Sequence, residues 1–70
     1  MRLSIFGLGY VGSVSMACFS SMGHSVIGVD SNNSKNELIN SGKSPVYEPG
    51  LEELLLEGLN NKKIAAIKTS

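Results

Sequence analysis

Residues 4–12 have the sequence SIFGLGYVG, in which a short apolar run leads into three glycines at positions 7, 9 and 12. In this G-x-G-x-x-G spacing, Gly7 allows a sharp turn, Gly9 lets a pyrophosphate approach the backbone, and Gly12 lets a helix pack closely on a strand. The spacing alone is a weak signal. Here it follows an apolar run, opens a helical pattern and precedes the acid Asp30 by about the ~20 residues that the motif expects. The stretch therefore predicts the βαβ unit of a dinucleotide-binding domain.

The residues around this turn predict which groups would hold a dinucleotide. A helix that begins near Tyr10 leaves its first backbone N–H groups unpaired, so those of Tyr10 and Val11 are the expected phosphate donors. Asp30 ends a second apolar run, where a carboxylate can accept hydrogen bonds from both ribose hydroxyls. Ser-Asn-Asn follows, without the arginine that often accompanies a 2′-phosphate, so NAD is favoured over NADP. Lys35 is expected in the first turn of the next helix, where it either faces the adenosine side of the cofactor or is a solvated surface lysine.

Two alternatives need no ligand. The glycines could form a turn without a bound phosphate, and Asp30 could be a solvated acid that caps the following helix. The full context of the motif favours the dinucleotide over both.

The size and composition of the chain limit what it can do alone. It has 70 residues, no net charge and a hydrophobic content of 41%. A typical domain has ~100–150 residues, so residues 1–70 are interpreted as the N-terminal portion of a dinucleotide-binding domain, with the rest of that domain and a substrate domain outside it. The balanced charge gives no reason to expect nucleic acid or membrane partners. One cysteine excludes an internal disulfide and provides no metal-ligand cluster.

Hydrophobic periodicity and turn residues predict six elements in the order strand, helix, strand, helix, helix, strand. They span residues 2–6, 10–22, 25–29, 34–40, 49–58 and 64–68. Gly23 and Gly42 are expected to end the first two helices, while Pro49 begins the third and Gly58 ends or frays it. This order predicts an α/β fold: the N-terminal part of a Rossmann doubly wound parallel sheet, with a βαβ unit, further helices and a possible third strand.

The apolar positions predict the buried faces of the helices. The expected stripes are Val11, Val14, Cys18 and Met22 on the first helix, and Leu51, Leu54, Leu55 and Leu59 on the third. Cys18 is therefore interpreted as a small core residue and not as a nucleophile. The segment YEPGL at 47–51 is either a structural loop that starts the third helix or a loop near the nucleotide. No catalytic triad, carboxylate pair or metal-ligand spacing is present in the sequence, so no catalytic or metal-binding residue is predicted.

Five stretches carry a more specific likeness. They are IFGLGYVG at 5–12, GH at 23–24, GVD at 28–30, LINSGKSP at 38–45 and EPGL at 48–51. Together they resemble the start of the UDP-glucose/GDP-mannose dehydrogenase family, and GLGYVG, GVD and GKSP are most similar to its GDP-mannose-oxidising members. The resemblance covers nearly all of the chain. Residues 67–70, IKTS, depart from the Thr-Thr-Asp-like stretch expected after the third strand, which puts the placement of that strand in doubt.

The resemblance implies an NAD-dependent oxidation of the C6 hydroxyl of a nucleotide sugar to a carboxylate. In such enzymes a cysteine, aided by a lysine and an asparagine, holds the intermediate covalently, and none of those positions falls within this chain. Carried over by position, the backbone at Tyr10 and Val11, together with Asp30 and Lys35, would contact NAD.

The same resemblance implies a substrate and a setting for the complete protein. It implies a cytoplasmic homo-oligomer that converts GDP-mannose to GDP-mannuronate with two NAD and supplies a uronic-acid polysaccharide such as alginate. The alternatives are a UDP-glucose 6-dehydrogenase that forms UDP-glucuronate, and a non-catalytic NAD-binding module.

Overall fold

The computed structural model describes residues 1–68, which form a three-stranded parallel sheet and three helices. The strands are β1 (Arg2–Phe6), β2 (Ser25–Asp30) and β3 (Ile64–Lys68), and the helices are α1 (Tyr10–Ser21), α2 (Asn33–Asn40) and α3 (Leu51–Asn60). The predicted α/β fold is confirmed, including its third strand. Thr69 and Ser70, which belong to the segment that departs from the family pattern, lie outside the described residues. Within residues 1–68, no helix is long and apolar enough to cross a membrane.

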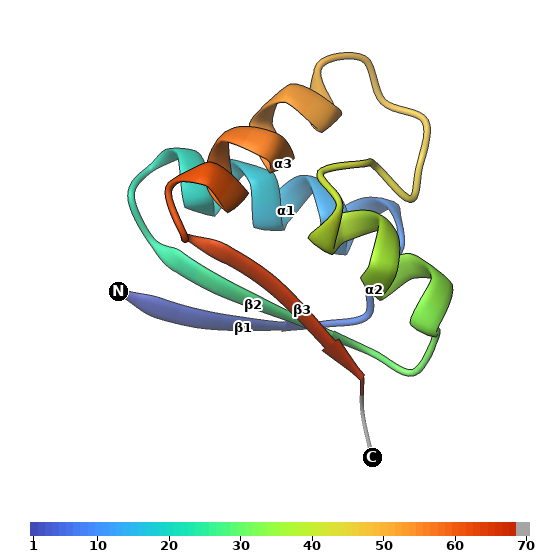
Figure 1. Cartoon of the computed structure of the whole chain (residues 1–70). Helices are drawn as coiled ribbons and strands as arrows, with labels where there is room; N and C mark the ends of the chain where they lie inside the picture. Colours follow the sequence, from blue (N-terminus) through green and yellow to red (C-terminus); the bar gives the residue numbers. More distant parts are fainter. Residues whose placement is uncertain (69–70) are drawn as a thin grey trace.

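The helices cover only one face of the sheet. β2 lies in the centre, with β1 and β3 at the edges, and all three helices lie on the same side (Figure 1). The covered face carries the buried residues Val26, Ile64 and Ala66, whereas Phe6 and Ile67 on the opposite face are exposed. This arrangement matches one βαβαβ half of a doubly wound sheet. In such a half the strands are added in one direction along the sheet, which places both connecting segments on the same face.

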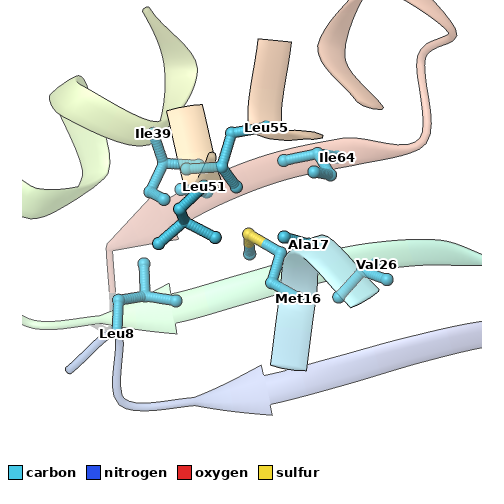
Figure 2. Close-up of a cluster of buried hydrophobic side chains, with 9 residues drawn as sticks. Leu8, Met16, Ala17, Val26, Ile39, Leu51, Leu55 and Ile64 are labelled. Atoms are coloured by element: carbon cyan, nitrogen blue, oxygen red, sulfur yellow. The ribbon is translucent and has the colours of Figure 1, made fainter. Parts of the chain in front are cut away.

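Aliphatic side chains from the sheet and all three helices form the core between these layers (Figure 2). Its buried members are Leu8, Met16, Ala17, Val26, Ile39, Leu51, Leu55, Ile64 and Ala66. Leu8, between the first two glycines of the motif, is fully buried and anchors the glycine turn in this core. Of the stripe predicted on α3, Leu51 and Leu55 belong to the core and Leu59 packs against it, whereas Leu54 is exposed.

The stripe predicted on α1 was wrong at three of its four positions, since only Val14 packs against the core. The buried residues of this helix are Ser13, Met16, Ala17 and Ser20, whereas Val11, Cys18 and Met22 are exposed. The small residues face the core because α1 approaches the sheet closely. Two serines tolerate burial because their hydroxyls donate to backbone carbonyls, from Ser13 to Leu8 at 3.1 Å and from Ser20 to Ala17 at 3.0 Å.

The predicted bounds of the third helix were also wrong at both ends. Gly50 is the N-cap of α3 and has a left-handed backbone with φ +83°, so the helix begins at Leu51 and not at Pro49. Gly58 lies inside the helix and is buried. A Cβ at this position would lie 2.4 Å from the Ile64 Cδ1 atom, so a larger residue would not fit. This glycine brings α3 close to β3 and does not end the helix.

An asparagine of α2 binds the edge strand β3. The Nδ2 atom of Asn40 donates to the Ala66 carbonyl, and its Oδ1 atom accepts from the Ala66 N–H, both at 2.9 Å. One side chain thus satisfies both backbone groups of a buried strand residue. The pair fixes β3 against α2.

Candidate dinucleotide-binding site

Backbone and side-chain groups at the end of β2 hold the glycine turn that links β1 to α1. The Gly7 N–H donates to the Val29 carbonyl at 2.8 Å, and the Leu8 N–H donates to Oδ2 of Asp30 at 2.7 Å. Gly7 has φ +91°, a left-handed conformation that favours glycine. The turn is therefore built jointly by the ends of two neighbouring parallel strands.

The glycines at positions 12 and 9 lack a side chain for different reasons. A Cβ on Gly12 would lie 1.9 Å from the Gly7 carbonyl oxygen, so this glycine is required for α1 to pack on the turn. A Cβ on Gly9 would meet no atom within 4 Å, and its φ of −75° suits any residue. Neither packing nor backbone conformation requires glycine at position 9. The open space at this position is what a ligand close to the backbone would need.

The N-terminus of α1 faces this space. Gly9 is its N-cap and provides no side-chain hydrogen bond, and the first turn contains no acidic residue. The N–H groups of Tyr10 and Val11 have no carbonyl four residues earlier within the helix. An open groove of about 680 Å³ includes the space beside these donors and continues along β1 and α1. Its lining consists of Ser4, Ile5, Phe6, Gly7, Gly9, Tyr10, Val11, Gly12, Ser15 and Phe19. Unpaired donors at the positive end of a helix suit an anion such as pyrophosphate.

Asp30 lies at the end of β2 as predicted, and both of its oxygens accept hydrogen bonds. Oδ2 accepts from the Leu8 N–H and Oδ1 from the Asn32 N–H, at 2.7 and 2.8 Å. These two bonds, in that order, hold the pKa of Asp30 below its ordinary value of 3.8, and the positive charge of Lys35 adds to the effect. The carboxylate is thus ionised at neutral pH. It keeps free lone pairs, because each oxygen can accept more than one hydrogen bond.

Lys35 lies in the first turn of α2, beside this carboxylate. Its backbone N–H donates to Oδ1 of Asn32, the N-cap of the helix, at 3.3 Å. Its side chain is half-buried, and its charge acts on Asp30. The structure therefore gathers the glycine turn, Asp30 and Lys35 at the carboxyl ends of β1 and β2. No cluster of three or more metal-binding side chains occurs among residues 1–68.

Two site residues were not predicted from the sequence. Ser13 donates to the Leu8 carbonyl and so supports the turn from below. Glu48 accepts a hydrogen bond from the Tyr10 hydroxyl, although 38 residues separate the two in sequence. The loop that contains Glu48 therefore contacts the first residue of α1, which favours the second of the two readings of YEPGL. Only the EPGL stretch itself marked this loop as unusual.

Known proteins share this sequence and geometry. The sequence model described as "UDP-glucose/GDP-mannose dehydrogenase family, NAD binding domain" matches residues 1–69. A GDP-mannose 6-dehydrogenase from Pseudomonas savastanoi pv. phaseolicola is 59% identical over 64 residues, which cover 91% of this chain and 15% of that protein. A UDP-glucose 6-dehydrogenase from Pseudomonas aeruginosa is 41% identical over 64 residues, which cover 91% and 14%.

A solved structure extends the comparison to the backbone. The crystal structure of a ternary complex of GDP-mannose dehydrogenase from Pseudomonas aeruginosa superposes with a TM-score of 0.94 at 55% identity. The match covers 96% of this chain and 15% of that one. The chain therefore spans about 15% of the length of these relatives.

Proposed function

The chain belongs to the UDP-glucose/GDP-mannose dehydrogenase family, as its NAD-binding domain, and on this premise we propose that residues 1–70 are the N-terminal portion of the Rossmann domain of a nucleotide-sugar 6-dehydrogenase. The observation that carries the proposal is the glycine turn held by Asp30, with an open space over Gly9 and unpaired N–H groups beside it. These residues fit a dinucleotide, because the space receives a phosphate and the carboxylate lies where an adenosine ribose would follow.

Each proposed contact has a physical role. The N–H groups of Tyr10 and Val11 would bind the pyrophosphate, and the glycines at 7, 9 and 12 would shape the turn that presents them. Asp30 would accept from the ribose hydroxyls, with Lys35 beside it. When bound, NAD supplies the hydride acceptor of the reaction. We assign no catalytic residue within the chain, and Cys18 on α1 is given no role in the chemistry.

For the complete enzyme we propose oxidation of GDP-mannose to GDP-mannuronate with two NAD. Support comes from the difference between relatives, since the GDP-mannose 6-dehydrogenase is 59% identical and the UDP-glucose 6-dehydrogenase 41%. The proposal includes a cytoplasmic homo-oligomer whose product supplies a uronic-acid polysaccharide such as alginate. Oxidation of UDP-glucose and NAD binding without catalysis are the other outcomes of the test.

The cofactor assignment is tested by calorimetric titration of the complete protein that carries this domain with NAD and with NADP. We expect NAD to bind more tightly, because the Asp30 carboxylate repels a 2′-phosphate. Asp30→Ala should weaken NAD binding by about tenfold or more, the effect of losing a charged hydrogen-bond partner. Circular dichroism of the variant shows whether the fold is retained. Equal affinity of a folded Asp30→Ala variant would refute the ribose assignment.

The substrate is tested with the complete protein that carries this domain. NADH formation is measured with GDP-mannose and UDP-glucose offered separately. Turnover with GDP-mannose alone is the expected result. Turnover with UDP-glucose alone would replace the proposed substrate, and NAD binding without turnover on either sugar would indicate a different sugar or a non-catalytic module.

A further inference from the structure

One contact joins the proposed phosphate site to a distant loop. The 43–50 loop, which connects α2 to α3, passes the N-terminal end of α1 (Figure 1, yellow). Within it, the Glu48 carboxylate accepts the hydrogen bond of the Tyr10 hydroxyl. The backbone carbonyl of Glu48 accepts from the Leu51 N–H at 3.1 Å, where α3 begins. Glu48 thus connects the first residue of α1 to the first residue of α3.

Tyr10 lies between two cavities. It lines the groove of about 680 Å³ over the glycine turn. It also lines a second cavity of about 250 Å³ between α1 and α3, together with Val14, Cys18, Glu48 and Leu54 among others. Tyr10 therefore contributes to the lining of the proposed cofactor groove, and its hydroxyl is held by Glu48, which lines the second cavity.

The exposure of this contact indicates that it contributes little to folding. Tyr10 is 53% exposed, and hydrogen bonds between exposed groups compete with water. Helix ends fray, and Tyr10 is the first residue of α1. A contact that already restrains the end of a helix lowers the entropy lost when a ligand binds and orders that end. The contact therefore increases the affinity for the ligand.

We propose that Glu48 is a positioning residue for the cofactor site: by holding the Tyr10 hydroxyl it orders the N-terminal residue of α1, and hence its N–H donors, before the dinucleotide binds. This inference rests on the proposed function of the same site. It also implies that NAD binding and the order of the 43–50 loop are coupled, since a coupling between two sites acts in both directions.

The affinity test uses the complete protein that carries this domain and five variants of it, with circular dichroism as the check of folding. Glu48→Ala and Tyr10→Phe should each weaken NAD binding by about three- to tenfold, the range of one net hydrogen bond. The double variant should be no weaker than either single one, because both remove the same contact. Glu48→Gln should restore most of the affinity, since its amide oxygen can accept the hydroxyl hydrogen. Tyr47→Phe is the matched control, because Tyr47 belongs to the same loop and is 92% exposed.

A second measurement follows the contact without NAD. The chain has two tyrosines and no tryptophan, so in a Tyr47→Phe background the ultraviolet titration reports Tyr10 alone. The hydrogen bond to Glu48 and the negative charge of its carboxylate raise the pKa of Tyr10 above its ordinary value of 10.0. Adding Glu48→Ala should therefore lower the pKa of Tyr10 toward 10.0.

The two measurements separate failure of the inference from failure of the proposed function. If the unmodified protein binds NAD but the Glu48 variants bind it equally well, or if the two single losses add, the inference is overturned and the proposed function stands. If the pKa of Tyr10 is the same with and without Glu48→Ala, the contact does not form in solution and the inference is overturned. If the complete, folded protein that carries this domain binds no NAD, the proposed function is refuted and the positioning role falls with it.

Discussion

Replacing Gly12 with alanine tests the close packing of α1 on the glycine turn. The added Cβ would lie 1.9 Å from the Gly7 carbonyl oxygen and 3.1 Å from its carbon, whereas real Cβ contacts essentially never fall below 3.0 Å. The helix or the turn would have to move by more than an ångström. The turn resists because the Gly7 N–H is bound to Val29, and the helix resists because Met16 and Ala17 are buried in the core.

The size of the effect follows from two opposing terms. Overpacking costs about 1–3 kcal/mol, and a collision with a backbone oxygen belongs at the upper end of that range. Alanine is favoured over glycine inside a helix by up to about 1 kcal/mol, which offsets part of the loss. A net loss of about 2 kcal/mol is expected. For a chain of 70 residues the total free energy of unfolding is only about 4–10 kcal/mol.

Urea unfolding followed by far-ultraviolet circular dichroism measures this loss. With a slope of about 1–2 kcal/mol per molar urea, the unfolding midpoint of Gly12→Ala should fall by roughly 1–2 M. Gly9→Ala is the matched control, because its Cβ meets nothing, and it should cost only about 0.5 kcal/mol as an N-cap change. It should nevertheless weaken NAD binding, since the methyl group enters the phosphate space. A Gly12→Ala midpoint within ~0.3 M of the unmodified chain would refute the packing argument.

Three further outcomes are expected. Because the pKa of Asp30 is lowered in the folded state, its contribution to stability is complete above the unfolded value of about 3.8 and is lost as pH falls through the folded value; urea midpoints should drop over that acid range, and less so in Asp30→Asn. Asn40→Ala should lower the free energy of unfolding by about 1–3 kcal/mol, since both backbone groups of Ala66 lose their partner. Asn33→Ala, at an exposed position of the same helix, is the control. An equal urea midpoint for the two variants would contradict a stabilising role of the Asn40–Ala66 hydrogen bonds. Cys18 is exposed, so a disulfide reagent should modify it in the native chain as fast as in urea, and Cys18→Ala should change stability by less than about 0.5 kcal/mol; slow native modification would place the thiol in the core after all.

The strands and glycine stops were predictable because their signals are local. Apolar runs between turn residues gave β1 and β3 with their observed bounds and β2 to within one residue. Gly23 and Gly42 have φ of +95° and +80°, as glycines that end helices do. The buried face of α1 was not predictable from hydrophobicity, because close approach to the sheet selects small residues such as Ser13 and Ala17 over larger apolar ones.

For the candidate site too, the features set by local sequence were predicted and those set by distant contacts were not. The glycine spacing and Asp30 are close in sequence to the elements that place them, so their positions followed from the motif. The partner of Tyr10 did not, because Glu48 lies 38 residues away in the loop between α2 and α3, and the tertiary fold brings the two together. Likewise, no local pattern indicates that Asn40 binds a strand residue 26 positions later.

Because of the hydrogen bonds that shape the glycine turn, the concentration of the dinucleotide should also affect the folding equilibrium of the chain. The acceptors for Gly7 and Leu8 are Val29 and Asp30, so the turn cannot take its shape until a chain loop of about 20 residues closes and β1 pairs with β2. A ligand that binds only the closed form adds its binding energy to that closure, about 2.7 kcal/mol at a hundredfold excess over Kd. For a short chain this is a large share of the total. The dinucleotide would then act as a folding partner, and the yield of native protein would follow its concentration.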